Sequence, residues 1–390
     1  MKQVYIIEAV RTPIGDFMGG LSSLTNVELG TIVAKEAVRR AALPPEAIEE
    51  VVCGMIYKGG SKGNPGRQIQ LAAGFPSSGY ASTIDQQCGS AMRATEILSQ
   101  QITLGKTDLG LAVGVESMSN AAYVVNGARK TRMGDVILHD TITHDGLNCA
   151  ICNYHMGLTA ENLAEKYGIT REEQDELALL SHQRARSAQD AGKFNNEIIP
   201  ITIEGKKGDV IVDRDEHPRD ITIEALAKLK PAFKKDGTVT AGNASGINDG
   251  GAALLLAGPD ASEKYGLKPK ARLLATASYG VDAEIMGIGP VYAIPKALDL
   301  AGLKIDDIDY FEINEAFAAQ FLACNRELNI DMEKVNANGS GIALGHPVGA
   351  TGIRIIVSMM SEMQRRGSRL GVASVCVGGG PAMAAVIEMM

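Results

Sequence analysis

The sequence predicts an α/β protein made of two related halves, and two observations support this fold class. First, three pairs of segments resemble each other at a nearly constant separation along the 390-residue chain: 41–52 with 301–312, 88–93 with 349–354, and 110–115 with 371–376. Such regular self-similarity indicates a repeated structural unit. Second, short Val-rich apolar runs alternate with segments of helical length, which is typical of strands buried between helices.

Within each half, the pattern predicts a helix, an acidic turn, a strand, a loop, a buried helix, a turn and a second strand. The runs 111–115 and 370–377 are short, apolar and bounded by glycine or polar residues, as expected of strands covered on both faces. We therefore expect an N-terminal half formed by residues 1–117 and 247–269, and a C-terminal half formed by residues 270–390.

The repeat is lost between the halves, over residues 118–246. This segment holds a long, highly charged helix pattern from Thr170 to Ala191, and Thr170 with Glu173 forms the sequence signature of a capping box at its start. We interpret residues 118–246 as an inserted domain that serves as a lid or in assembly.

Composition excludes several classes of function. A formal net charge of −8 argues against a nucleic-acid partner, because polyanion binding needs a basic surface. No apolar run approaches the roughly 20 residues of a membrane-spanning helix, and the first residues enter an apolar strand without the pattern of a secretory signal. Six cysteines are too few for a disulfide scaffold in a chain of this length. We expect a cytoplasmic protein without nucleic-acid or membrane partners.

Two cysteines lie where a turn meets a regular element. Cys88 follows a polar turn and precedes a helical pattern, so the helix amino end would stabilise its thiolate and make it a nucleophile. Cys376 follows a predicted strand and precedes three glycines. One thiol can carry an acyl group while the other moves a proton, which suits carbon–carbon bond chemistry between thioesters. The alternative for Cys88 is a small buried residue.

A histidine stands in a glycine-rich turn, residues 341–352. The glycines allow close approach of the backbone to a ligand, and Pro347 stiffens the turn. His346 can act there as a general base. The alternative is that the turn only ends one element and starts the next, with His346 as a cap.

Four motifs resemble the thiolase family, in their order along the chain and in their spacing. They are the turn Gly345-His346-Pro347-x-Gly-Ala-x-Gly, the segments 314–318 and 243–250, and Cys376-x-Gly-Gly-Gly. The likeness runs from Glu8 to the carboxyl end. It implies a thiolase-like fold, with two pseudo-repeated α/β halves in a layered α-β-α-β-α core and an inserted loop domain. The segment 154–161, with His155 and Met156, resembles the short-chain, biosynthetic subgroup.

The resemblance also implies catalytic roles. Cys88 would be the acylated nucleophile, His346 would activate it, and Cys376 would be the acid and base. Asn314 would hold a water that, together with His346, receives the enolate oxygen. The backbone N–H groups of Cys88 and Gly378 would form a second oxyanion hole. Such donors are needed because the α-proton of a thioester is too weakly acidic for an unassisted thiolate.

For coenzyme A, the resemblance implies contacts mostly in the inserted segment. His155 and Met156 would lie along the pantetheine, and Arg219 near the nucleotide, where a basic residue suits a phosphate. The remaining expected contacts are Ala232, Phe233 and Ser245, with Met286, Ala316 and Phe317 at the acyl end. For Phe233 and Phe317 the alternative is core packing.

The function implied is the reversible condensation of two acetyl-CoA molecules to acetoacetyl-CoA and CoA, as part of fatty acid metabolism. No permanently bound cofactor and no metal are expected, and the family implies a homotetramer built as a dimer of dimers. One alternative is a degradative 3-ketoacyl-CoA thiolase of broader chain length. Another is a thiolase-like protein that binds acyl-CoA without turnover. Ketoacyl synthases and hydroxymethylglutaryl-CoA synthases share the fold without using the second cysteine.

Three positions depart from the family pattern. Asp85 stands where asparagine is usual, Ala91 where glycine is usual, and Pro381-Ala382 replaces a more flexible pair. Pro381 removes one N–H group close to the expected oxyanion hole.

Two further hypotheses concern the cysteines and histidines. The spacing of His144, Cys149, Cys152 and His155 could supply zinc ligands, and Cys149 with Cys152 alone could be a redox pair. Oxidation of Cys88 and Cys376 to a disulfide would switch the protein off.

Overall fold

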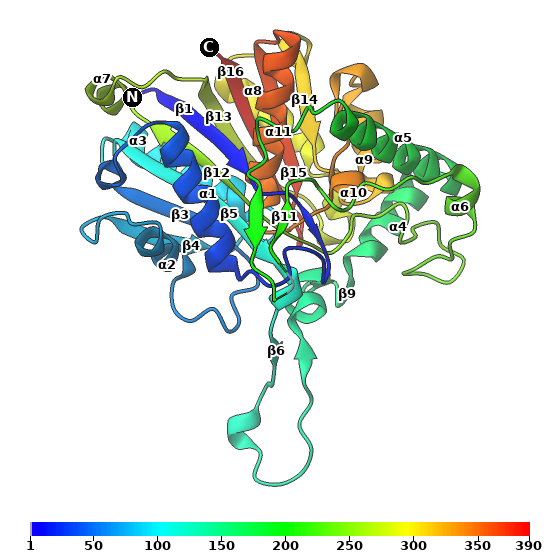
Figure 1. Cartoon of the computed structure of the whole chain (residues 1–390). Coiled ribbons are helices and arrows are strands. Elements are labelled where there is room, and N and C mark those ends of the chain that lie inside the picture. Colours follow the sequence, from blue (N-terminus) through cyan, green and yellow to red (C-terminus); the bar gives the residue numbers. More distant parts are fainter. Residues whose placement is uncertain (1, 207) are drawn as a thin grey trace.

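The computed structural model describes residues 2–206 and 208–390 and contains one large mixed sheet (Figure 1). Its main path is β14-β15-β16-β13-β1-β12-β5-β3-β4, and β2 pairs with β12. The strands are β1 (Val4–Arg11), β2 (Gly15–Asp16), β3 (Glu50–Gly54), β4 (Tyr80–Ile84), β5 (Leu109–Ser117), β12 (Asn248–Ala257), β13 (Ala271–Gly280), β14 (Tyr310–Ile313), β15 (Leu370–Cys376) and β16 (Pro381–Met389).

Side-chain alternation along the strands separates five layers. In β5, Leu111 and Val113 face the cluster under α1 and α2, whereas Ala112 faces α3 and α11. In β16, Met383 faces α3 and α11, whereas Ala384 faces α8 and α9. The helices of these layers are α1 (Asn26–Arg40), α2 (Pro65–Ala72), α3 (Ser90–Thr103), α8 (Pro290–Ala301), α9 (Ala318–Leu328) and α11 (Thr351–Arg366). The predicted α-β-α-β-α order is therefore confirmed.

The repeated segments occupy equivalent places in the two halves. Residues 110–115 lie in β5, which runs parallel to β3, and residues 371–376 form most of β15, which runs parallel to β14. The halves join where β1 pairs with β13 over only three residue pairs, Val4↔Leu273 to Ile6↔Ala271. This short junction lets the two parts of the sheet cover opposite sides of α3 and α11.

The segment between the halves contributes helices and small hairpins, and each strand described in it pairs within its own hairpin. Thr170 caps the predicted charged helix with the expected capping box. The elements are β6 (Tyr123–Val124) with β7 (His139–Asp140), β8 (Asn148–Cys149) with β9 (Tyr154–His155), β10 (Ile201–Ile203) with β11 (Val210–Val212), and the helices α4 (Met156–Tyr167), α5 (Arg171–Asp190) and α6 (Ile223–Ala227). The short helices α7 (Pro259–Tyr265) and α10 (Gly341–Leu344) follow later in the chain.

A buried ion-pair cluster ties this segment to β1. The Arg11 side chain is fully buried, and its Nε donates to Glu197 at 2.7 Å. Its two terminal nitrogens donate to the Asp215 carboxylate at 2.6 and 2.9 Å. Because Arg11 alone balances both carboxylates of this cluster, removing it would leave two buried negative charges without a partner. Among the described residues, no helix has both the length and the apolar character that a membrane crossing requires.

Glycine permits the close approach of the two central helices. A Cβ atom on Gly352 of α11 would lie 2.5 Å from the backbone nitrogen of Met92 of α3. A Cβ atom on Gly54 of β3 would lie 2.4 Å from the backbone of Ser90, at the start of α3. Contacts this short leave no room for a side chain, so the backbones themselves set the spacing of the layers.

We predict that Gly352→Ala lowers the free energy of unfolding by about 1–3 kcal/mol, because the added methyl group pushes α3 and α11 apart. Urea unfolding measures this change. The control is Gln364→Ala on the exposed side of α11, for which a change within about 0.5 kcal/mol is expected. Equal stability of the two variants would contradict the prediction.

Candidate active site

The turn before α3 holds Cys88 at the edge of a cavity. Gln87 adopts a left-handed backbone conformation with φ of 47°, and the Asp85 carboxylate accepts a hydrogen bond from the Gln87 N–H at 3.2 Å. Asp85 also pairs with Lys58 at 2.9 Å. The carbonyl oxygen of an asparagine side chain could accept the same Gln87 bond, so the turn tolerates the departure at Asp85.

The turn before α11 holds His346. Its backbone N–H donates to the Asn248 side-chain oxygen at 3.0 Å, and its Nδ1 lies 2.6 Å from the Thr351 hydroxyl. Gly345 has φ of 99°, and a Cβ atom there would lie 2.6 Å from the Asn248 side chain. Asn248 at the start of β12 thus fixes the entry of the histidine turn.

A buried carboxylate joins the loops of the two halves. Glu116 accepts N–H groups of Ile56 and Tyr57 in the first half at 3.0 and 3.1 Å, and of Gly349 in the second half at 3.0 Å. Burial raises the pKa of Glu116 to about 8, against the opposing effect of these three donors. The sequence analysis missed Glu116, because a glutamate at the end of a buried strand carries no motif.

The two turns and the end of β15 enclose one small cavity of about 50 Å³. Cys88, His346, Cys376 and Gly378 all line it, as predicted for the catalytic groups. The predicted residues Met156, Ser245, Met286, Ala316 and Phe317 also line it. Four further side chains that line the cavity were not predicted from the sequence. They belong to Tyr57, Gln87, Leu147 and Val348.

Asn314 directly follows β14 and is not among the residues that line this cavity. Its side chain is fully buried, and its Oδ1 accepts a hydrogen bond from Arg354 at 3.2 Å. The Nδ2 group has no hydrogen-bond partner among the described residues. Since an unsatisfied buried amide is costly, this donor is available to a water or a ligand.

Burial keeps the three reactive groups neutral at neutral pH. It raises the pKa of Cys88 to about 11, while the backbone N–H groups of Gly378 and Cys88 act in the opposite direction. It raises the pKa of Cys376 well above its usual value, with a further contribution from Cys88. It lowers the pKa of His346 to about 3, with a further contribution from Arg354. The resting site therefore holds two thiols and a neutral imidazole.

The structure also accommodates the departures from the family pattern at Pro381 and Ala91. The backbone N–H groups that act on the Cys88 sulfur belong to Cys88 and Gly378, so Pro381 removes neither of them. The Pro381 carbonyl oxygen instead accepts the Val377 N–H at 2.9 Å. Ala91 is fully buried against Gly114, whose Cβ would lie 2.5 Å from the Ala91 methyl. The missing side chain of Gly114 leaves the room that Ala91 takes.

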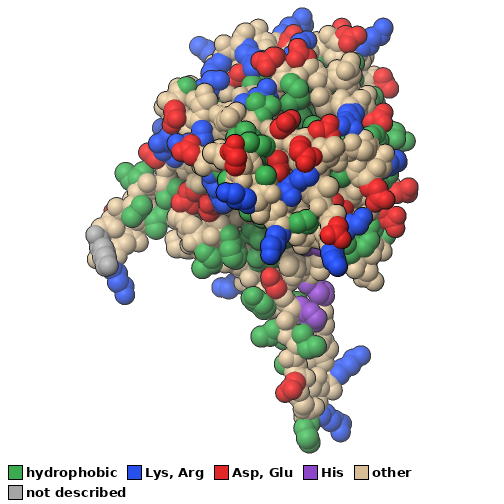
Figure 2. Space-filling model, turned by 90° about the vertical axis from the view of Figure 1, so that its right-hand side faces the viewer, with side chains coloured by type: hydrophobic (Ala, Val, Ile, Leu, Met, Phe, Trp, Pro, Cys, Tyr) green, Lys and Arg blue, Asp and Glu red, His purple; other side chains and the backbone are tan. Residues whose placement is uncertain are grey.

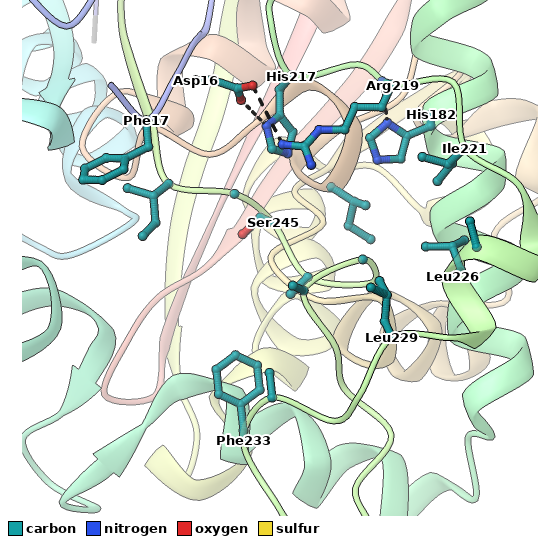
Figure 3. Close-up of a pocket in the computed structure, with 18 of the residues that line it drawn as sticks. Asp16, Phe17, His182, His217, Arg219, Ile221, Leu226, Leu229, Phe233 and Ser245 are labelled. Carbon is teal, nitrogen blue, oxygen red and sulfur yellow. Dashed lines mark hydrogen bonds and ion pairs between the residues drawn. The ribbon is translucent and has the colours of Figure 1, made fainter. Parts of the chain in front are cut away.

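A larger cavity of about 750 Å³ lies beside the small one, and Leu147 and Ser245 line both. Of the residues predicted to contact coenzyme A, it is lined by His155, Arg219, Ala232, Phe233 and Ser245. Figure 3 shows Arg219, Phe233 and Ser245 around it. The His155 ring stacks on Phe233 with centroids 4.5 Å apart. His155 is also the N-cap of helix α4, because its Nδ1 accepts the Gly157 N–H at 3.0 Å. The wall is mainly apolar, as suits a long flexible ligand.

One end of the larger cavity is polar, and the sequence analysis identified only Arg219 there. Figure 3 shows Asp16, His217, Arg219 and His182 gathered at this end. His217 Nδ1 lies 2.5 Å from Asp16, and Arg219 lies 3.8 Å from the same carboxylate. The Arg219 backbone N–H donates to His182 Nδ1 at 3.2 Å. His217 stands two residues before Arg219, and that neighbourhood was the available signal.

The alternative zinc site is not assembled in the part of the chain that is described. No group of three or more His, Cys, Asp or Glu side chains lies close enough to hold a metal ion there. His144 instead contacts Asp145 at 2.6 Å, and Cys149 accepts the Cys152 N–H at 3.3 Å. All six cysteines are free thiols, and disulfides at Cys149–Cys152 or Cys88–Cys376 stay predictions.

The chain is similar to known proteins over its whole length. Models of the N-terminal and C-terminal domains of thiolases match residues 4–260 and 267–389. An acetyl-CoA acetyltransferase of Allochromatium vinosum is 48% identical over 100% of both chains. The structure of acetyl-CoA acetyltransferase from Syntrophomonas wolfei has a TM-score of 0.98 and 50% identity, with 100% of both chains covered. Human mitochondrial 3-ketoacyl-CoA thiolase in complex with CoA has a TM-score of 0.96 and 41% identity, covering 100% of this chain and 98% of that chain.

We predict that His182 makes stability fall as the medium becomes acidic. Burial, with His217 and Arg219 contributing, lowers its pKa from 6.5 to about 4. Between these values the unfolded chain binds a proton that the folded chain does not, so stability decreases as pH falls from about 6.5 towards 4.

The test is His182→Asn, since an asparagine oxygen can still accept the Arg219 N–H. Between pH 7.5 and pH 5, the wild type should lose about 2 kcal/mol of unfolding free energy relative to the variant. Urea unfolding at the two pH values measures this difference, and a constant difference would contradict the prediction.

Proposed function

Because the chain belongs to the thiolase family, we propose that it condenses two acetyl-CoA molecules reversibly to acetoacetyl-CoA and CoA. The convergence of Cys88, His346 and Cys376 on one small cavity beside a long apolar cavity carries this proposal. Relatives named acetyl-CoA acetyltransferase, 48% and 47% identical over the whole chain, support it. Coenzyme A thioesters are the substrates, and no permanently bound cofactor has a part in the scheme.

The first half-reaction transfers an acetyl group to Cys88. The Cys88 thiol gives its proton to His346, and the sulfur attacks the thioester carbonyl carbon. The N–H groups of Cys88 and Gly378 stabilise the oxyanion. The carbon–sulfur bond to CoA then breaks, and the Cys376 thiol protonates the departing CoA sulfur. This leaves acetyl-Cys88, an imidazolium at His346 and a thiolate at Cys376.

The second half-reaction forms the carbon–carbon bond. The Cys376 thiolate removes an α-proton from a second acetyl-CoA. The His346 imidazolium and the Asn314 amide, acting through a water, donate to the enolate oxygen. The enolate carbon attacks acetyl-Cys88, and the Cys88 sulfur leaves and recovers its proton from His346. Acetoacetyl-CoA is released, and all three groups return to their neutral resting forms.

The two cavities divide the substrate between them. His155, Phe233 and the apolar wall suit the pantetheine, while Arg219 at the exposed rim suits a phosphate of the nucleotide. Met156, Met286 and Phe317 surround the small cavity, whose volume of about 50 Å³ favours an acetyl group over long chains. A degradative thiolase of broader chain length is the second candidate, favoured by the 41% identity to human 3-ketoacyl-CoA thiolase.

The proposed assembly is a homotetramer in which residues 118–246 contribute both CoA contacts and subunit contacts. An arm formed by β6, β7 and the loop between them extends away from the body (Figures 1 and 2). The exposed apolar residues of the arm are Tyr123, Met133, Val136, Ile137 and Leu138. Apolar side chains on such an extension favour contact with another subunit.

Six free thiols suit a reducing compartment, and we propose the cytoplasm as the location of the protein.

We predict that Cys88→Ala and Cys376→Ala fail at different steps. Cys88→Ala should form no acetyl adduct with acetyl-CoA, because the nucleophile is gone. Cys376→Ala should still form the adduct on Cys88, more slowly because the departing CoA sulfur has lost its acid, but should lose at least about 10³-fold in condensation, because nothing removes the α-proton. Intact-protein mass spectrometry measures the adduct, and formation of acetoacetyl-CoA measures the condensation. Near-normal turnover by Cys376→Ala would refute the scheme.

We also predict that Met156 limits the acyl chain. Met156→Ala should raise the rate on a six-carbon 3-ketoacyl-CoA, relative to acetoacetyl-CoA, by about tenfold or more, since one methylene is worth about 10–200-fold in such a pocket. The control is Met332→Ala, because Met332 packs in the cluster around α8 and α9 and lines neither cavity. An unchanged rate ratio in Met156→Ala, or efficient long-chain turnover by the wild type, would favour the degradative reading.

A further inference from the structure

The first turn of the buried helix α11 contacts two groups of the site at once. Thr351 and Arg354 are three residues apart, so they project from the same face of the helix. Their exposed fractions are 0% and 1%. Thr351 lies against the His346 ring, and Arg354 lies against the Asn314 amide. These are the two groups that donate to the enolate oxygen in the proposed reaction.

The contact with Thr351 determines which nitrogen of His346 carries the proton. The Thr351 hydroxyl lies 3.0 Å from the Pro347 carbonyl oxygen and 2.6 Å from His346 Nδ1. The hydroxyl donates its single hydrogen to this carbonyl oxygen, which also accepts the Ala350 and Thr351 N–H groups. The hydroxyl oxygen must then accept a hydrogen from Nδ1. The neutral ring therefore carries its proton on Nδ1 and has its lone pair on Nε2.

This arrangement confines proton exchange to one side of the ring. Nδ1 stays protonated whether the imidazole is neutral or charged, so every proton that His346 gains or loses is on Nε2. Since His346 lines the small cavity and Nδ1 is engaged by Thr351, Nε2 is the nitrogen left for Cys88 and the substrate. A ring with the other tautomer could not accept the Cys88 proton there.

The contact with Arg354 determines the orientation of Asn314. A guanidinium has five donors and no acceptor, so the side-chain oxygen of Asn314 must face it, as the 3.2 Å contact requires. The amide nitrogen then points away from Arg354. This nitrogen is the buried donor without a partner among the described residues. A reversed amide would place two donors against each other and lose the enolate-binding N–H group.

Resting on the proposed function, we propose that Thr351 and Arg354 are positioning residues: Thr351 fixes the tautomer of His346, and Arg354 fixes the amide of Asn314. Neither side chain touches the reacting atoms. Both act from one helical turn whose distance from α3 is set by Gly352 against Met92. The enolate-binding pair is thereby built before the substrate arrives, which is the condition for electrostatic stabilisation of a transition state.

The two contacts have different kinetic consequences. His346 takes part in both half-reactions, whereas Asn314 acts only on the enolate. A change at Thr351 should therefore slow both acetylation of Cys88 and condensation. A change at Arg354 should slow condensation and leave acetylation near its normal rate, because the N–H groups of Cys88 and Gly378 are unaffected. Binding of CoA in the larger cavity should change little in either case, so kcat should fall while KM stays within about threefold.

The experiment compares four variants of the full-length enzyme. Thr351→Val removes the hydroxyl at nearly constant volume, and Thr351→Ser restores it. Arg354→Lys keeps the charge but not the planar guanidinium geometry. Ser358→Ala is the matched control, because Ser358 lies one helical turn further along the same buried face and donates to Glu197 at 3.2 Å, outside the site. Rapid-quench mass spectrometry follows acetyl-Cys88, and formation of acetoacetyl-CoA follows condensation.

For Thr351→Val, we expect kcat to fall about 10–100-fold and the serine variant to recover most of it. For Arg354→Lys, we expect condensation to fall about 10²–10³-fold, as when one oxyanion donor is lost, with acetylation changed less than threefold. Histidine ¹⁵N NMR should assign a protonated Nδ1 to His346 in the wild type and a mixture of tautomers in the valine variant. Ser358→Ala should match the wild type in all three measurements.

Valine and lysine variants that behave like Ser358→Ala would overturn the proposal, and so would an unprotonated Nδ1 in the wild type. Equal losses in both half-reactions for Arg354→Lys would overturn the role given to Arg354. If Arg354→Lys does not fold, the valine and serine pair decides the outcome. A wild type that forms no acetyl-Cys88 would instead refute the proposed function, which keeps the two failures distinct.

Discussion

The direct packing of α3 against α11 is the constraint on which the site depends. Gly352 brings the backbone of α11 against Met92 of α3, and Gly54 brings β3 against Ser90. Cys88 lies two residues before α3, and His346 lies in the turn before α11. The spacing of the two helices therefore sets the spacing of thiol and imidazole. Neither half could complete the site alone, because each contributes one helix of this pair.

Burial gives the site its proton chemistry. The same low-dielectric surroundings raise the pKa values of both thiols and lower that of His346. A charged resting state is thus disfavoured, and charge appears only when a proton moves between neighbouring groups. The buried donors are already oriented when this occurs. The cavity needs no bulk water for these transfers, which protects a reactive enolate from solvent protons.

Motifs and periodicity predicted the two halves, the buried strands and the capped helix at Thr170. The family resemblance implied most of the residues that line the small cavity, but not Tyr57, Gln87, Leu147 or Val348. Glycine, histidine and cysteine in a fixed order are visible in a sequence because few other residues can replace them. Glu116, Asp16 and His182 escaped because their roles arise from contacts between distant segments. Asn314 was identified, but only the structure shows that its side chain is fully buried and that its oxygen accepts a hydrogen bond from Arg354.

Cys88 and Cys376 face the same small cavity, and chemical cross-linking tests this directly. Dibromoacetone can join two nearby sulfurs through a three-carbon bridge, with loss of bromide from each end. Peptide mapping after brief treatment should give a dominant product that joins the Cys88 and Cys376 peptides, and preincubation with acetyl-CoA should suppress it. Separate alkylation of the two cysteines, or a bridge from Cys88 to Cys152 instead, would contradict the account.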